Sequence, residues 1–284
     1  MRLGSTKVRL TMAVAVVGLG GVGVGLAVAQ SPAPTVTVNA TPTAVSIDPA
    51  GPLAGGPTRF NFVRPAGGKD VAVYVALLVP GVSVDQLAKT LSREDGTDRD
   101  SSLGLVSIQA STALDAGVNQ RAVTFTVKAG LTYVVVSEEQ TEGNGPVKRA
   151  FTTFTSSGDA NGATAAKPAA TVRFQGLRFR GPSTLPRKGV VRFENRDGVA
   201  HFALAFPLKK GTTTAEFRKA LFAGSERAFG KVLSGAPYMA QNIISGGDTS
   251  NDEELSFPKS GKYALVCFID QHDRLGMYKL VTVK

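Results

Sequence analysis

Cysteine and histidine are scarce in this chain of 284 residues, which contains one Cys and two His. A single Cys cannot form a disulfide within the chain, and these counts also exclude a zinc finger and an iron–sulfur cluster framework. The hydrophobic fraction is 43%, which is enough for a packed core and excludes a wholly disordered protein. Any metal or thiol chemistry must therefore use Cys267, His201 or His272.

Clustered charge is also missing. The net charge is +10, but the basic residues are scattered or form short pairs such as Arg187-Lys188 and Lys209-Lys210. A nucleic-acid surface would combine a basic patch with interleaved aromatic side chains, and no such patch occurs. We therefore expect a solvated basic surface and no nucleic-acid partner.

The N-terminus has the pattern of an export signal. A basic start precedes an apolar, glycine-rich run from Leu10 to Ala29, and the run ends in the A-x-A cleavage site Ala27-Val28-Ala29. We predict a signal peptide over residues 1–29, cleaved after Ala29, and a protein exported to the cell envelope or beyond. The alternative is an uncleaved membrane anchor, because the run is long enough to span a bilayer. No later segment is long and apolar enough to span a bilayer, so no membrane span is expected after cleavage.

Two low-complexity segments divide the rest of the chain. Residues 30–44 are rich in Pro, Thr and Ala and predict a flexible tether, and residues 156–170 predict a linker. Between and after them lie two segments of similar length, residues 45–155 and 171–284. Each is of a reasonable size for one domain.

The two segments look like an internal repeat with an offset of 130 residues. One offset relates distant blocks of sequence, which is hard to obtain by chance. The matched residues are Gly81 with Gly211, Leu91 with Leu221, and Tyr133 with Tyr263.

Short apolar runs punctuated by Gly and Pro predict an all-β chain. Residues 71–78 and 202–206 have the composition of buried strands, and each run precedes a short helix with capping-box spacing. Further strands are expected at the end of each half. The expected fold is two tandem Greek-key β-sandwich domains, each with a short inserted helix. The helix-capping pairs are Ser83 with Gln86 and Thr213 with Glu216.

All candidate metal-ligand chemistry lies in the second half. His201 begins an early strand, Cys267 closes a late strand, and His272 and Met277 lie on the loop beyond it. Two imidazoles and a thiolate make a trigonal plane for copper, and a thioether is a weak axial ligand. After signal cleavage the chain would contain one Cys, two His and two Met, and four of these five residues stand in this order.

Residues 171–284 resemble the cupredoxin family of plastocyanin- and azurin-like domains. The resemblance lies in Asn195-x-x-Gly198-x-x-His201 and in the C-x4-H-x4-M spacing that ends at Met277. It implies a single copper ion with His201, Cys267 and His272 as equatorial ligands and Met277 as the axial ligand. The residue after the first histidine, often Asn in the family, is Phe202 here.

The first half resembles the same fold more weakly, through the repeat, and the whole chain resembles exported bacterial two-domain members. At the offset of 130, Val71 stands opposite His201 and Ser137 opposite Cys267, so the first half offers no imidazole or thiolate. We expect it to be a ligand-free cupredoxin-like domain with a structural or interaction role.

Two functions of different classes follow. In the first, the protein binds copper in the cell envelope for one-electron transfer or copper handling, has a redox or envelope protein as partner, and is not an enzyme. In the second, it is a metal-free structural or interaction module, and Cys267 and the two His are ordinary core or loop residues. The two functions make different predictions about the structure. Copper binding requires that four side chains converge on one point, namely His201, Cys267, His272 and Met277.

Overall fold

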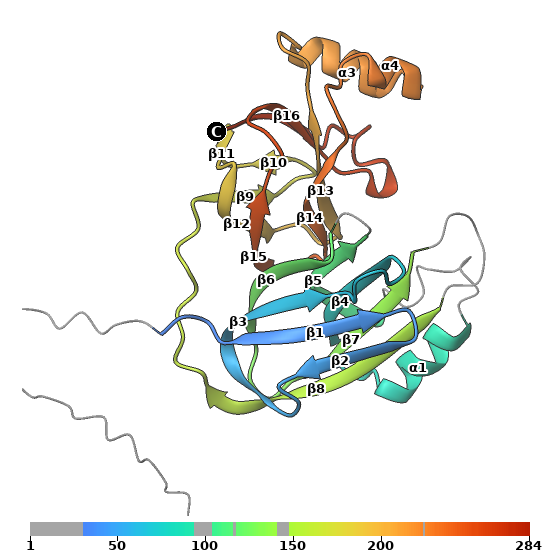
Figure 1. Cartoon of the computed structure of the whole chain (residues 1–284), viewed down its shortest axis with the longest axis vertical. Helices are drawn as coiled ribbons and strands as arrows, with labels where there is room; N and C mark the ends of the chain where they lie inside the picture. Colours follow the sequence, from blue (N-terminus) through green and yellow to red (C-terminus); the bar gives the residue numbers. More distant parts are fainter. Residues whose placement is uncertain (1–30, 94–103, 116–117, 141–147, 224) are drawn as a thin grey trace, which may run out of the picture. The chain divides into compact units, whose positions relative to one another are not determined.

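The structure is a computed structural model that describes residues 31–93, 104–115, 118–140, 148–223 and 225–284 (Figure 1). The predicted signal peptide, residues 1–29, lies outside the described residues. Residues 31–284 form one compact unit. Within the described ranges, no helix combines the length and apolar character needed to cross a bilayer.

Strands account for 52% of the structure and helices for 10%, which confirms the predicted β-rich class. The elements of the first half are β1 (Thr35–Thr41), β2 (Ala44–Asp48), β3 (Leu53–Val63), β4 (Val71–Leu78), α1 (Val84–Arg93), β5 (Val106–Leu114), β6 (Gln120–Val127), β7 (Thr132–Glu139) and β8 (Arg149–Ala160).

The second half has a similar succession, with five strands followed by two helices, α3 and α4, and then four more strands. Its elements are β9 (Ala170–Phe174), β10 (Phe179–Arg180), β11 (Thr184–Leu185), β12 (Lys188–Asn195), β13 (His201–Pro207), α3 (Thr214–Phe222), α4 (Glu226–Gly230), β14 (Tyr238–Ile244), β15 (Thr249–Ser256), β16 (Gly261–Val266), the 3₁₀ turn η1 (Ile269–Gln271) and β17 (Tyr278–Val283).

The strand pairings of the first half recur in the second. In the first half β1 runs parallel to β3, β3 pairs with β6, β4 pairs with β5 and β7, and β7 pairs with β8. The corresponding pairs are β9 with β12, β12 with β15, β13 with β14 and β16, and β16 with β17. The register also corresponds, because Tyr133 pairs with Leu77 and Tyr263 pairs with Pro207, 130 residues further along both strands.

Each half has its own apolar core, formed by strands whose side chains alternate between buried and exposed. Tyr133 and Tyr263 are buried at equivalent places in the two cores. The Tyr133 hydroxyl accepts a hydrogen bond from the Lys128 amide, and the Tyr263 hydroxyl donates one to the Lys259 carbonyl. Each ring therefore fills the core while its polar end is satisfied by the backbone.

The two predicted helices are confirmed. The Ser83 hydroxyl accepts a hydrogen bond from the Gln86 amide at the start of α1. Thr213 and Glu216 form a complete capping box at the start of α3. The apolar residues at spacing i,i+4 on these helices are buried, as the pattern predicts: Leu87 and Leu91 on α1, and Phe217 and Leu221 on α3.

Two separate tandem sandwiches are not confirmed, because strands of both halves join one sheet. β15 pairs with β6, and the described residues form a twelve-stranded sheet that includes β9, β10, β12 and β15 from the second half. The remaining strands of the second half form a sheet of five. Two segments expected to be flexible contain strands. The predicted tether, residues 30–44, contains β1, whose Val36, Val38 and Ala40 are buried in the first-half core, and the predicted linker, residues 156–170, begins as the end of β8. Composition did not indicate this, because pairing with β3 is a long-range contact.

Polar groups cross between the halves beside this join. The Ser111 hydroxyl donates to the Ile243 carbonyl, and the Asn251 side chain donates to the Gln109 carbonyl. Glu253, which pairs with Val123 across the β15–β6 ladder, is 2% exposed. Burial raises the pKa of Glu253 to about 8, although the charge of Arg121 opposes the shift. The carboxyl is therefore protonated at neutral pH.

This buried carboxyl predicts a pH-dependent stability that Glu253→Gln removes. The unfolded chain releases the Glu253 proton at the ordinary pKa of a carboxyl, whereas the folded chain keeps it up to about pH 8. Stability is therefore lost as the pH rises through this window, by about 1.4 kcal/mol per pH unit. Urea unfolding should show that, between pH 5.5 and pH 7.5, the free energy of unfolding falls by about 2–3 kcal/mol more in the native chain than in the variant. Parallel pH profiles would contradict a buried, neutral Glu253.

Candidate metal centre

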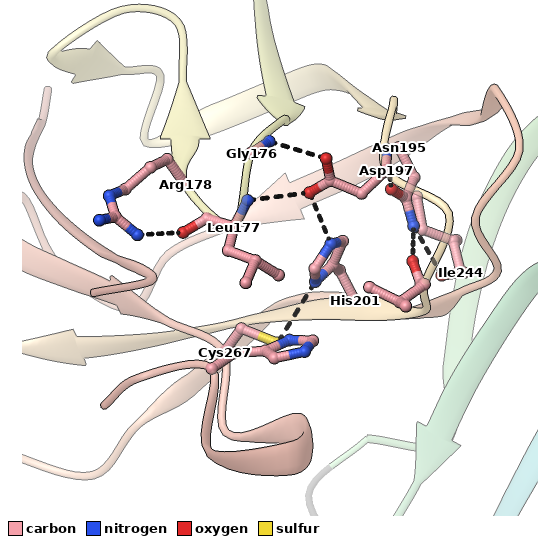
Figure 2. Close-up of polar contacts among 10 residues, drawn as sticks. Gly176, Leu177, Arg178, Asn195, Asp197, His201, Ile244 and Cys267 are labelled. Carbon is pink, nitrogen blue, oxygen red and sulfur yellow. Dashed lines mark hydrogen bonds and ion pairs between the residues drawn. The ribbon is translucent and has the colours of Figure 1, made fainter. Parts of the chain in front are cut away.

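The turn before β13 is held by one buried amide side chain. Asn195 ends β12, and its Nδ2 donates to the carbonyls of Val199, at 2.8 Å, and Ile244, at 3.2 Å. Its Oδ1 accepts the Asp197 amide. These bonds fix residues 195–201 against β14, and Figure 2 shows Asn195 between the turn and Ile244. The Asn195-x-x-Gly198-x-x-His201 pattern thus describes a turn that presents His201 at a defined place.

Gly246 lets the same turn pack closely on the loop after β14. A Cβ at this position would lie 2.5 Å from the Asp197 carbonyl oxygen and 2.6 Å from the Val199 nitrogen. Any side chain there would push the turn away. The position of His201 therefore depends on a glycine 45 residues further along the chain.

Asp197 joins this turn to the loop between β9 and β10. Its carboxylate accepts the amides of Gly176, at 2.7 Å, and Leu177, at 3.1 Å, and its Oδ2 lies 2.9 Å from Nε2 of His201 (Figure 2). Burial raises the pKa of Asp197, but the two amides and the His201 ring outweigh it, so the net pKa is lowered. An ionised carboxylate only accepts hydrogen bonds, so Nε2 carries the proton and Nδ1 keeps its lone pair.

The loop from Cys267 to Met277 closes on its own backbone. The Cys267 amide donates to the Met277 carbonyl, and the Met277 amide donates to the His272 carbonyl. The loop turns back through left-handed backbone at Asp270, Gln271 and Gly276. These bonds hold the two ends of the loop, Cys267 and Met277, together and place His272 beside them.

Arg178 ties this loop to the Asp197 side of the site. Its Nη1 donates to the Leu275 carbonyl at 2.6 Å and to the Leu177 carbonyl at 2.8 Å. At Gly276 a Cβ would lie 3.0 Å from the guanidinium carbon, and the backbone there has a φ of +95°, so the position suits glycine. One guanidinium thus connects the loop that carries His272 to the loop that holds Asp197.

The structure brings three of the four predicted ligands to one point. The ligand atoms of His201, Cys267 and His272 all lie within 4.8 Å of one another. Cys267 Sγ is 3.9 Å from Nδ1 of His201 and 3.6 Å from Nδ1 of His272. The Sγ and His201 are fully buried, and His272 is 5% exposed.

These separations fit a shared metal ion. Bonds of about 2.0–2.1 Å to an imidazole nitrogen and about 2.3 Å to a thiolate, set about 110–120° apart, place N and S about 3.6–3.8 Å from each other. The measured Sγ–Nδ1 distances lie close to that range. The donor set of two imidazoles and one thiolate therefore needs little rearrangement to hold an ion.

Electrostatics also prepare the two ligands that are fully buried. Burial lowers the pKa of His201, helped by His272 and opposed by Asp197, so this imidazole is neutral and can act as a ligand. Burial raises the pKa of the Cys267 thiol, although the amides of Phe202 and Ile269 favour the thiolate. A bound cation reverses that preference, because it deprotonates a coordinating thiol.

Met277, the fourth predicted ligand, is fully buried in the same core cluster as Cys267. Its backbone bonds to Cys267 and His272 place it beside both ligands. Its role as an axial ligand stays a prediction. Sequence reasoning did not find Asp197 or Arg178. The only signal for Asp197 was its position four residues before His201, within the turn motif.

No protein-family model and no curated protein matched the sequence. Among solved structures, auracyanin A, a "blue" copper protein from Chloroflexus aurantiacus, is similar at 19% identity and a TM-score of 0.27, over 40% of this chain and 96% of that one. The copper nitrite reductase of Thermus scotoductus is similar at 13% identity and a TM-score of 0.23, over 90% of this chain and 68% of that one. The multicopper oxidase Fet3p, which functions in iron import, is similar at 10% identity and a TM-score of 0.26, over 92% of this chain and 67% of that one.

These similarities correct one expectation from the sequence. The chain was expected not to be an enzyme, but the similar structures include a nitrite reductase and multicopper oxidases, which are enzymes. The absence of a recognisable catalytic motif was the basis of that expectation, and it does not exclude turnover. The case for a metal depends on the side chains of the site.

Proposed function

We propose that this chain binds one copper ion and serves in one-electron transfer. The observation that carries the proposal is the buried cluster of His201, Cys267 and His272, whose ligand atoms lie within 4.8 Å of one another. Met277 is proposed as the weak axial ligand. Two imidazoles, a thiolate and a thioether are the set used by electron-transfer copper sites, and the ion would supply a Cu(I)/Cu(II) couple.

The protein residues would keep the site rigid and dry. Asn195 and Asp197 hold His201 in one orientation, and Arg178 fixes the loop that carries His272. A ligand set that moves little between oxidation states costs little reorganisation during transfer, and burial of Cys267 excludes water from the thiolate.

Apolar side chains around the site support contact with a protein partner. Of the five large apolar side chains that are exposed in the described part of the chain, three belong to segments that carry ligands. They are Val199 in the turn before His201, Phe268 next to Cys267, and Leu275 in the loop after His272. Exposed apolar residues beside a buried metal site suit a transient redox contact.

Export and internal duplication complete the proposal. The basic, apolar and A-x-A pattern of residues 1–29 supports export to the cell envelope, with cleavage after Ala29. The shared register of the two halves, 130 residues apart, supports two repeats of one cupredoxin-like unit, predicted over residues 45–155 and 171–284, with β1 and the end of β8 added to the first. The first repeat would be the ligand-free one.

Copper(II) added to the purified protein should produce an intense visible absorption from the Cys267 thiolate to the metal. We expect the absorption to saturate at one equivalent of copper and to be absent in Cys267→Ser. Zinc should occupy the site without colour and delay the copper signal. If copper produces no such absorption in the native chain, the copper site is refuted and a metal-free structural or interaction module is the better account.

Asp197→Asn should raise the reduction potential of the copper-loaded protein. The carboxylate increases the donor strength of His201 and places a negative charge near the ion, which favours Cu(II). We expect a rise of about 60 mV, equivalent to a tenfold change in relative affinity for the two oxidation states. Redox titration followed at the visible band measures it. The control is Asp248→Asn, which removes an exposed carboxylate that pairs with Arg196 and should leave the potential unchanged. Equal shifts in both variants would contradict a specific role for Asp197.

A further inference from the structure

A hollow of about 430 Å³ lies where β6 of the first half and β15 of the second separate (Figure 1). The ladder between these strands consists of two residue pairs, Thr124 with Asp252 and Val123 with Glu253. Past these pairs the strands diverge, and residues 120–122 of β6 face the hollow. Its volume falls within the range of about 300–1,000 Å³ that is usual for small-molecule sites. None of the proposed metal ligands lines it, so it is separate from the metal cluster.

Arg121 brings a positive charge into this hollow. Its Nη2 donates to the Met239 carbonyl at 2.9 Å, and its guanidinium carbon lies 5.4 Å from the centre of the Tyr238 ring. Nε and Nη1 have no partner among the described residues and are accessible to solvent. The carboxyl of Glu253, buried nearby, is protonated at neutral pH and does not compensate the charge. A carboxylate in the hollow would form charge-assisted hydrogen bonds to these free nitrogens.

The charges around the hollow favour a ligand with one negative charge. Glu254 also lines the hollow, but Nε and Nη2 of Arg59 hold its carboxylate at 2.6 and 3.0 Å. The two charges of this bidentate pair cancel each other. The wall thus contains two guanidinium groups and one carboxylate, and the charge of Arg121 is left in excess.

The other polar side chains of the wall offer hydrogen-bond acceptors. Nε2 of Gln120 donates to Oδ1 of Asn61 at 2.7 Å, which leaves Oε1 of Gln120 to accept. The carboxylate of Glu254 has lone pairs beyond those that face Arg59, and the Ser256 hydroxyl both accepts and donates. A ligand that matches this wall therefore carries hydroxyl donors in addition to its carboxylate.

We propose that the hollow binds a small hydroxylated carboxylate, of the class of sugar acids. Its carboxylate pairs with Arg121, and its hydroxyl groups donate to Gln120 and Glu254. A single sugar ring fits the volume of the hollow. The site draws on both halves of the chain, because β6 and β15 each supply part of the wall, and it does not require a metal to be bound.

The test titrates the full chain, without added metal, with glucuronate and follows the heat of binding. We expect saturable binding at one site. Glucose has the hydroxyl groups but no carboxylate, so it should bind at least tenfold more weakly. Cyclohexanecarboxylate has a ring of the same size and the carboxylate but no hydroxyl groups, so it should bind about fivefold more weakly.

Three variants locate the site. Arg121→Gln should lower the affinity for glucuronate to that for glucose, because the charged donors are lost. Arg227→Gln is the matched control, since it removes the same charge from an exposed position on α4, outside the wall, and it should leave the affinity unchanged. Ser256→Phe places a ring in the hollow and should weaken binding at least tenfold. Circular dichroism and thermal melting verify folding, and Ser256→Phe, at an exposed strand position, decides the matter if Arg121→Gln does not fold.

Absence of saturable glucuronate binding overturns the proposal. It is overturned equally if the preference for glucuronate over glucose survives in Arg121→Gln, or if Arg227→Gln loses as much affinity as Arg121→Gln does. Binding of cyclohexanecarboxylate as tight as that of glucuronate, or native binding by Ser256→Phe, also contradicts it. Because no metal is present, the outcome is independent of whether the chain binds copper.

Discussion

The hydrogen bond between Asp197 and His201 is the contact on which the metal cluster depends. The carboxylate reaches His201 from the turn after β12 while it accepts two amides from the loop after β9. It therefore orients the ring, fixes its tautomer and joins two segments that are distant in sequence. Arg178 extends the connection to the loop between β16 and β17, so hydrogen bonds link the segments on both sides of the cluster.

The two halves share strand pairings and register, but only one has the chemistry of a metal site. Where the second half has His201, the first has Val71, which is buried in the apolar core. Where the second has Cys267, the first has Ser137, whose hydroxyl donates to the Thr41 carbonyl. At these two described positions the first half therefore has an apolar core residue and a hydroxyl that is bonded to the backbone. The fold is common to both halves, and the function depends on a few side chains that one half lacks.

Much of the local structure could be predicted from the sequence. Apolar runs located β4 and β13, and capping pairs located α1 and α3, because these signals depend on near neighbours. The scarcity of Cys and His limited the cluster to three residues, and their spacing suggested how they meet. These are the features for which short-range chemistry is sufficient.

Contacts between distant segments were not predictable in the same way. The pairing of β15 with β6 and the hydrogen bond of Arg178 to the Leu275 carbonyl each join residues more than 90 positions apart. No local sequence pattern marks these contacts. Asp197 has the sequence context of an ordinary turn residue, and only the structure places it beside the His201 ring. The expected separation into two sandwiches did not hold for the same reason, since a polar β15 gave no sign that it pairs with the other half.

X-ray absorption at the copper edge tests the central claim most directly, because it counts the ligands of the bound ion. For the protein loaded with one equivalent of copper, we predict one short sulfur contact from Cys267 and two imidazole nitrogens from His201 and His272. A first shell made only of nitrogen and oxygen atoms would contradict the account, because it would show that copper binds elsewhere and that the buried thiol is a core residue.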